Sequence, residues 1–293
     1  MNCSGLQHSR TLVCLSSEAQ PLIPNFPMPA NYHTHTPLCQ HAEGEPEEYV
    51  DAAIAAGWSE YGISDHAPLR PEPFDDWRML ESDLPAYFEW IERARKHAAG
   101  RLPIRAGLEC DWLEGCNEWV ADLASRYEWD YLIGSIHYLG DWDFDNPKWV
   151  GSAWVDMDLD DIWERYWATY ARMAESGLFD ILGHPDLIKK FGYRPKGNLV
   201  RFYEPAIAAI AASGCTIELN TSGWHRPAQE AFPSPVFLEL ACSAGIPVVI
   251  STDAHSPEEV GRDMQRGIEM VKLVGYTETQ LFEGRKRRSE PLW

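Results

Sequence analysis

Positive charge is scarce in this 293-residue chain. Lysine and arginine together number 25, against 45 aspartate and glutamate residues, so the formal net charge at pH 7 is −20. A surface that binds a nucleic-acid backbone or an anionic membrane needs the opposite balance. The composition therefore predicts neither a nucleic-acid partner nor a membrane partner, and it leaves the oligomeric state open.

Cysteine pairs and long apolar runs are also missing. The seven cysteines are odd in number and contain no Cys-x-x-Cys pair, which argues against a disulfide framework and against a thiolate zinc site. No apolar run approaches the roughly 20 residues that span a bilayer. We therefore expect a cytoplasmic protein in a reducing compartment.

The two ends of the chain lack the patterns of a packed domain. Residues 1–30 are predicted to be a disordered extension, because the first 27 residues contain one short apolar patch and match a signal peptide weakly. An alternative is that synthesis begins at Met28. Residues 31–285 are expected to form a single domain, and residues 286–293 a solvated tail that continues the basic run 285–288.

Between these ends, short β-rich runs alternate with longer helical patterns. Seven such units occur, with strands expected at 31–35, 60–64, 103–109, 130–137, 179–183, 215–220 and 247–251, and helices at 46–56, 82–99, 114–126, 159–176, 198–212, 234–243 and 257–273. Repeated βα units predict an α/β fold with a parallel sheet, either open or closed as a barrel. No glycine-rich dinucleotide motif follows the first strand, so a (β/α)7 barrel is favoured. The long connection 138–158 is expected to lie over the barrel mouth as a lid or wall.

Polar groups that can bind metals stand at the C-terminal end of every predicted strand. In a parallel barrel these ends gather at one face, where active sites are built. The groups are His33 and His35, Asp65 and His66, Glu109, His137, His184, Glu218 and Asn220, and Asp253 and His255. Their placement predicts a metal centre at this face.

Two of these strand ends have the spacing of a metal clamp. In extended backbone, residues two apart point to the same side, so the imidazoles of His33 and His35 should converge. Asp253 and His255 repeat this spacing after a buried apolar run. His41 follows in a turn beyond the first clamp, and a simple loop histidine is the alternative there. His137 and His184 would each be unremarkable alone, as core histidines near a strand end.

Histidine and carboxylate ligands without cysteine suit zinc, manganese or iron. Glu109 ends an apolar strand, where a buried carboxylate needs a metal or a basic residue to compensate it. Nine candidate ligands are too many for one ion, so we expect two or three divalent ions with Glu109 bridging. Paired metals are a usual device for hydrolysing phosphate esters.

These motifs resemble the PHP (polymerase and histidinol phosphatase) superfamily of metal-dependent phosphoesterases. The resemblance runs from about residue 31 to 285, and the segments around His184 and Glu218 are most similar to the histidinol-phosphate phosphatase branch. It implies a distorted (β/α)7 barrel and three metal sites. The implied ligand sets are His33, His35, Glu109 and Asp253 for one ion, Glu109, His137 and His184 for a second, and His41, His66 and His255 for a third.

The implied reaction is hydrolysis of L-histidinol phosphate to L-histidinol and phosphate, in histidine biosynthesis, by a metal-bridging hydroxide held by Glu109. Asp65 or His225 is the candidate proton donor to the leaving group. Arg226 is the candidate phosphate ligand, with a surface arginine as the alternative. Glu218, Asp186 and Asn220, or the tryptophan-rich loop around Trp142, are the candidate contacts to the rest of the substrate.

Two other functions stay open at this point. A related phosphoesterase could act on another small phosphate ester, such as a nucleotide or a sugar phosphate. A non-catalytic metal-binding module is the second alternative, and the complete ligand set argues against it.

Overall fold

The structure is a computed structural model that describes residues 28–292. The predictions for residues 1–27 lie outside the described residues. Residues 28–30 were also assigned to the disordered extension, and this was wrong, because Met28 bridges to Trp58 and Ala30 is buried. Within residues 28–292, no helix combines the length and the apolar character needed to cross a membrane.

Seven parallel segments form a closed, distorted barrel. Five belong to one sheet, in the order β3 (Glu109–Asp111), β4 (Ile133–Ser135), β5 (Ile181–Leu182), β6 (Thr216–Asn220) and β7 (Val248–Ser251). β1 (Tyr61–Ile63) pairs in parallel with β2 (Ile104–Ala106), and β2 and β3 are successive parts of one barrel segment. A bridge from His66 to Glu109 continues the pairing beyond β1. Residues 31–34 close the circle, because Asn31 bridges to Tyr61 and Thr34 bridges to Ala254. The predicted (β/α)7 barrel is confirmed.

Two predicted strands differ in detail from the observed ones. Residues 31–35 contribute isolated bridges in place of a continuous strand, and the strand expected at 103–109 is split into β2 and β3. The aromatic ring of Tyr131 fills the barrel interior beside this split, where a Cβ on Gly107 would lie 2.2 Å from it. Only glycine lets the backbone pass the ring so closely.

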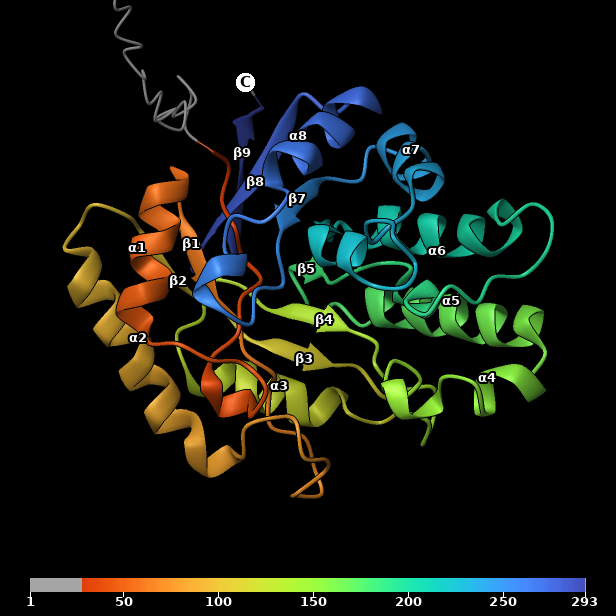
Figure 1. The fold of residues 1–293 in the computed structure, drawn as a ribbon, viewed down its shortest axis with the longest axis horizontal. Helices are drawn as coiled ribbons and strands as arrows, with labels where there is room; N and C mark the ends of the chain where they lie inside the picture. Colours follow the sequence, from red (N-terminus) through yellow and green to blue (C-terminus); the bar gives the residue numbers. More distant parts are fainter. Residues whose placement is uncertain (1–27, 293) are drawn as a thin grey trace, which may run out of the picture.

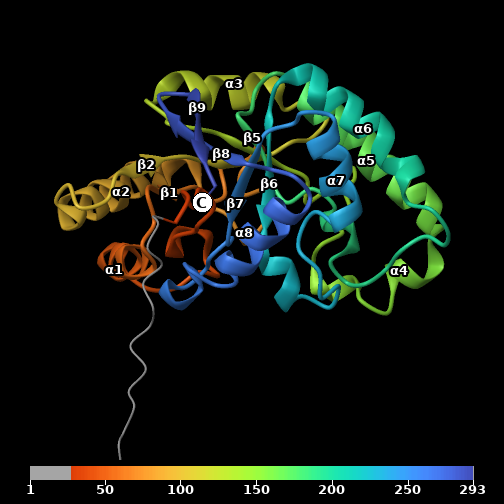
Figure 2. The same cartoon turned by 90° about the horizontal axis from the view of Figure 1, so that it is seen from above.

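Helices surround the barrel (Figures 1 and 2). They are α1 (Pro46–Ala56), α2 (Leu84–Ala98), α3 (Asn117–Arg126), the short α4 (Ala153–Asp156), α5 (Leu159–Glu175), α6 (Val200–Ser213), α7 (Pro235–Ser243) and α8 (Met264–Leu273). Their starts follow local signals, as in α7, where Ser234 accepts a hydrogen bond from the Phe237 backbone and proline occupies the first turn. The helix expected at 257–273 was too long, because its first part forms a 3-10 turn at Pro257–Glu259.

The C-terminal residues close the end of the barrel opposite the predicted site. β8 (Glu278–Glu283) and β9 (Lys286–Pro291) form an antiparallel hairpin, so the solvated tail expected from residue 286 was wrong. The side chains of β9 are mostly exposed and show no apolar alternation, and backbone pairing with β8 holds the strand in place. From β8, Leu281 and Phe282 pack into the barrel interior beside Tyr32 and Tyr131.

The long connection 138–158 forms one wall of the barrel mouth, as expected. Phe144 and Trp154 anchor it in the core, and Asp145, Asn146 and Pro147 line the cavity at the mouth.

Candidate metal centre

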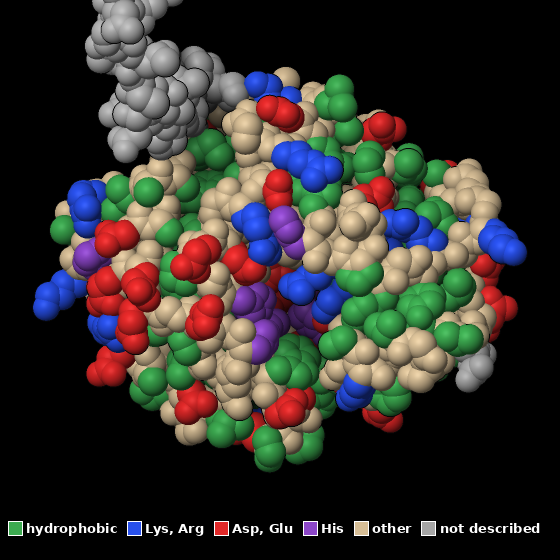
Figure 3. Space-filling model, viewed as in Figure 1, with side chains coloured by type: hydrophobic (Ala, Val, Ile, Leu, Met, Phe, Trp, Pro, Cys, Tyr) green, Lys and Arg blue, Asp and Glu red, His purple; other side chains and the backbone are tan. Residues whose placement is uncertain are grey.

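A cavity of about 540 Å³ opens at the C-terminal ends of the strands. Figure 3 shows histidines in a hollow at the centre of this face, with lysine and arginine side chains on one side of them. Seven of the predicted ligands line the cavity, namely His41, His66, Glu109, His137, His184, Asp253 and His255. His33 and His35 lie at its base and are almost fully buried.

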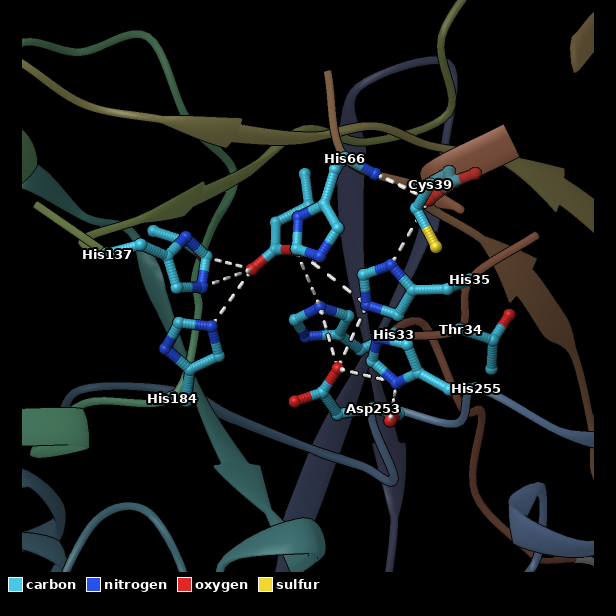
Figure 4. Close-up of polar contacts among 12 residues, drawn as sticks. His33, Thr34, His35, Cys39, His66, His137, His184, Asp253 and His255 are labelled. Carbon is cyan, nitrogen blue, oxygen red and sulfur yellow. Dashed lines mark hydrogen bonds and ion pairs between the residues drawn. The ribbon is translucent and has the colours of Figure 1, made fainter. Parts of the chain in front are cut away.

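Glu109 stands at the centre of this arrangement. Figure 4 shows the imidazoles of His66, His137 and His184 converging from different elements. Its Oε1 lies 2.9 Å from His184 Nε2 and 3.7 Å from His137 Nε2. Its Oε2 lies 2.8 Å from His66 Nδ1 and 3.3 Å from His33 Nε2. One carboxylate therefore faces imidazoles from four different segments of the barrel.

A second carboxylate, that of Asp253, joins the two clamps. Its Oδ1 lies 2.9 Å from His35 Nε2 and 3.6 Å from His33 Nε2. His255 stacks on His35 with ring centroids 4.0 Å apart, and His41 lies beside His255 at 4.7 Å. The structure thus brings all nine predicted ligands together, including the turn residue His41.

Several ligand atoms point at one another without ordinary hydrogen bonds. His33 Nε2, His66 Nδ1 and Glu109 Oε2 are buried and have no hydrogen-bond partner among the described residues. Such groups are costly unless a ligand satisfies them. Ligand atoms of His33, His35 and Asp253, of His33, Glu109 and His184, and of His35, His66 and His255 each lie within 4.8 Å of one another. The residues fit divalent metals of the zinc, manganese or iron type.

Buried carboxylates behind the imidazoles fix their orientation. Glu218 Oε1 lies 2.9 Å from His33 Nδ1, Asp65 Oδ1 lies 3.3 Å from His35 Nδ1, and Asp111 Oδ1 lies 2.9 Å from His137 Nδ1. A carboxylate on Nδ1 fixes the tautomer and leaves Nε2 for a metal.

The positions of Asp65 and Glu218 therefore do not support the roles expected of them. Asp65 is fully buried behind His35 and also accepts a hydrogen bond from Thr36, which does not support proton donation to a leaving group. Glu218 is fully buried and accepts the His184 backbone N–H at 2.7 Å, which does not support a substrate contact.

Three further expectations are corrected in the same way. Asn220 is buried, and its amide donates to Glu218 and to Asp253. Asp186 is fully buried and pairs with Lys189 Nζ at 2.9 Å. His225 points outward and pairs with Asp263. None of the three lines the cavity, so neither a substrate contact for Asn220 or Asp186 nor proton donation by His225 is supported.

Unusual backbone accompanies two ligands. His184 has φ of 25° and Asp253 has φ of 55°, a region that residues other than glycine rarely adopt and that is concentrated at functional sites. A Cβ on Gly183 would lie 2.5 Å from Ser135 Oγ, so glycine is required for β5 to approach β4 there.

The charges of the cluster perturb its titration. Burial disfavours the imidazolium form of His33, but Glu218, Glu109 and Asp253 raise its pKa well above the usual value. Burial likewise opposes the charge on His137, yet Asp111 and Glu109 raise its pKa to about 9. For His66, burial dominates and lowers the pKa to about 4. Burial disfavours the Glu109 carboxylate, but the surrounding histidines hold its pKa well below the usual value.

Several cavity residues were missed by sequence reasoning. Trp77 stands edge-on to His66 with ring centroids 4.8 Å apart, and Lys190 Nζ lies 3.0 Å from Asp145 Oδ2. Asp76 and Ser222 also line the cavity. They lie outside strand ends and follow no repeated spacing, so the ligand pattern could not find them.

One predicted phosphate ligand is found at the cavity, and one thiol lies near the candidate metal ligands without having been predicted there. Arg226, the predicted phosphate ligand, does line the cavity. The Cys39 thiol, which was not expected near the metals, lies within 4.8 Å of ligand atoms of His41 and His255.

Comparisons with known proteins agree with this geometry. The family model described as PHP domain matches residues 31–222. The chain is 41% identical over 255 residues to a probable histidinol-phosphatase of Deinococcus radiodurans, covering 87% of this chain and 96% of that protein. It is 27% identical to the histidinol-phosphatase of Bacillus subtilis, covering 78% of this chain and 94% of that protein.

A solved structure shares the fold. The crystal structure of histidinol phosphate phosphatase from Lactococcus lactis, complexed with zinc, L-histidinol and phosphate, superimposes with a TM-score of 0.75 at 20% identity, covering 88% of this chain and 98% of that one. The resemblance found in the motifs is therefore confirmed over nearly the whole described chain. The chain belongs to the PHP domain family.

Proposed function

We propose that this protein is a metal-dependent phosphatase that hydrolyses L-histidinol phosphate to L-histidinol and inorganic phosphate in histidine biosynthesis. The observation that carries the proposal is the convergence of nine candidate ligand side chains, Glu109 among them, at the floor of an open cavity. The probable histidinol-phosphatase at 41% identity supports the choice of substrate.

In this proposal the three ligand sets implied by the family hold the metals. His33, His35, Glu109 and Asp253 form the first set, Glu109, His137 and His184 the second, and His41, His66 and His255 the third. When bound, divalent ions neutralise the phosphoryl oxygens and make water a nucleophile at neutral pH. The short distances from Glu109 to members of the first two sets support its bridging role.

Two cationic side chains at the cavity support binding of the phosphate. Arg226 and Lys190 line it, and a guanidinium suits bidentate recognition of phosphate oxygens. Lys190 is held toward the cavity by Asp145, whose backbone carbonyl accepts a hydrogen bond from Nζ at 2.9 Å. We assign phosphate binding to Arg226 and Lys190.

The remaining walls suit the cationic and aromatic end of the substrate. Asp76 and Asp145 supply carboxylates for the ammonium group, and the indole of Trp77 supplies a surface for the imidazole. These side chains replace Glu218, Asp186 and Asn220 as the proposed contacts to the leaving group.

A cytoplasmic location is part of this proposal. The cysteines within the described residues, Cys39, Cys110, Cys116, Cys215 and Cys242, are free thiols, which suits a reducing compartment.

Phosphate release tests the proposal directly. Purified, metal-loaded protein is assayed with L-histidinol phosphate, nucleoside monophosphates, a sugar phosphate and an aryl phosphate, and the metal content is measured on the same sample. We expect the highest kcat/KM for L-histidinol phosphate. Comparable turnover of a nucleotide or sugar phosphate would overturn the substrate, and no turnover by fully metallated protein would overturn the enzyme assignment.

A further inference from the structure

We propose that Arg78 is a positioning residue that fixes both the orientation of His137 and the position of Trp77, which lines the cavity and stacks on Tyr138. The inference rests on the metal site of the proposed function. It concerns a buried guanidinium that does not touch the cavity.

Arg78 is 2% exposed and joins two carboxylates from different parts of the chain. Its Nη2 lies 3.0 Å from Asp111 Oδ2, at the end of β3. Its Nε lies 2.9 and 2.8 Å from the two oxygens of Asp75, in the loop before α2. Its Nη1 donates to the Ala67 carbonyl at 3.2 Å. The planar fork of arginine thus serves three partners at once, which a lysine cannot do.

The first carboxylate, that of Asp111, also contacts the proposed metal ligand His137. Asp111 Oδ1 accepts hydrogen bonds from His137 Nδ1 at 2.9 Å and from the His137 backbone N–H at 3.2 Å. These two bonds set the ring plane and leave Nε2 facing Glu109. Arg78 holds the second oxygen of the same carboxylate, so it fixes the position from which Asp111 acts.

The second carboxylate, that of Asp75, is linked through Tyr138 to Trp77 in the cavity wall. Asp75 Oδ2 accepts the Tyr138 hydroxyl at 2.7 Å. The Tyr138 ring stacks on Trp77 with an interplanar angle of 11°, and Trp77 stands edge-on to His137 with centroids 5.4 Å apart. The Arg78 guanidinium lies 4.3 Å from the centroid of the same indole.

These contacts form a closed ring, because Tyr138 directly follows His137 in the chain. From His137 the ring runs through Asp111, Arg78 and Asp75 to Tyr138, and the peptide backbone completes it. Without the guanidinium, two nearly buried carboxylates would face each other with no cation between them. Asp111 would then be free to move, and the hold on His137 would be lost.

The test compares Arg78→Met and Arg78→Lys with a matched control, Arg105→Met. Arg105 is also largely buried and joins two carboxylates, Glu60 and Glu283, but it lies at the far end of the barrel. Metal ions per chain, thermal midpoint with and without chelator, kcat and KM are measured on each purified protein.

For Arg78→Met we expect metal affinity and kcat to fall by about 10- to 100-fold, with the loss confined to about one ion per chain. Arg78→Lys should recover part of the metal content, because it keeps the charge without the fork. Arg105→Met should lower the thermal midpoint while metal content stays at the wild-type level. Tyr138→Phe, which removes only the hydroxyl at Asp75, should raise KM about 5-fold without changing metal content.

Full metal content and wild-type kcat in folded Arg78→Met would overturn the proposal. So would equal metal loss in Arg105→Met, since the effect would then be general destabilisation. If Arg78→Met does not fold, wild-type metal content in Arg78→Lys together with wild-type KM in Tyr138→Phe would overturn it. Metal content is measured without substrate, so a wrong substrate assignment would leave this comparison intact.

Discussion

The two ends of the barrel each hold a buried carboxylate, but the partners of the two carboxylates differ. At the N-terminal end, Glu60 is 3% exposed, and at the C-terminal end Glu109 is 1% exposed. Glu60 accepts hydrogen bonds from Arg105, from Arg288 and from the Tyr32 hydroxyl at 2.9 to 3.0 Å. Glu109 faces imidazoles, and its Oε2 has no hydrogen-bond partner among the described residues.

The difference separates stability from function. A fully paired buried charge needs no further partner, so its role is structural. Clustered side chains with unmet bonding capacity are costly, and the rest of the fold must hold them together. The bottom of such barrels generally serves stability and the top serves chemistry. Equal burial, therefore, has different consequences at the two ends.

Exchanging each carboxylate for an amide gives the largest contrast. Glu109→Gln should lower kcat by more than about 100-fold and reduce the metal content, because the amide removes the charge that two ligand sets share. Activity with L-histidinol phosphate and elemental analysis measure the two effects. Full activity in this variant would show that Glu109 does not bridge.

Glu60→Gln is the matched control. It should keep metal content and kcat within about 2-fold of wild type and lose about 1–3 kcal/mol of stability, since its arginines lose their charged partner. Denaturant unfolding measures the loss. A Glu60→Gln protein without metal would show that the two ends are not separable.

The orienting carboxylates should give the next largest effect. Glu218→Gln is expected to reduce activity or metal affinity by about 10- to 100-fold, because the amide holds His33 Nδ1 without a charge. Metal titration and steady-state kinetics measure this change. If KM alone rose, Glu218 would be a substrate contact after all.

A smaller effect is expected at the phosphate contact. Arg226→Met should raise KM for L-histidinol phosphate about 10-fold and leave the metal content unchanged, because a charged hydrogen bond is lost. Inhibition by inorganic phosphate should weaken in parallel. Unchanged phosphate inhibition would mean that Arg226 is a surface arginine.

The smallest effect on activity is expected for a core substitution in the C-terminal hairpin of β8 and β9. Leu281→Ala removes a buried side chain from the apolar cluster that also contains Tyr32 and Tyr131 and should cost about 2–5 kcal/mol of stability. Its kcat should match that of wild type at temperatures where it is folded. A lower kcat in the folded protein would couple the two ends of the barrel.

Periodic features of the sequence predicted most of the fold and the grouping of the candidate ligands. The alternation of β-rich runs and helical patterns predicted the seven units, and the spacing of His33 with His35 and of Asp253 with His255 predicted that these four side chains lie together. Such spacings can be interpreted from the sequence alone, because strand geometry places residues two apart on the same face.

Roles that depend on packing direction could not be predicted. Glu218, Asn220 and Asp186 lie on or just beyond strand ends, yet the structure turns them behind the imidazoles or into the core. Trp77 and Lys190 come from loops whose paths are set by contacts distant in sequence, such as that of Lys190 with Asp145. The strand β9 escaped prediction because backbone pairing, without an apolar pattern, holds it.

The most direct test measures metal content and phosphate release on the same preparation before chelation, after chelation and after the metal is restored. We expect two or three ions per chain, turnover of L-histidinol phosphate that disappears with the metal, and recovery when zinc, manganese or iron returns. Fully metallated, folded protein that releases no phosphate from L-histidinol phosphate would contradict this expectation.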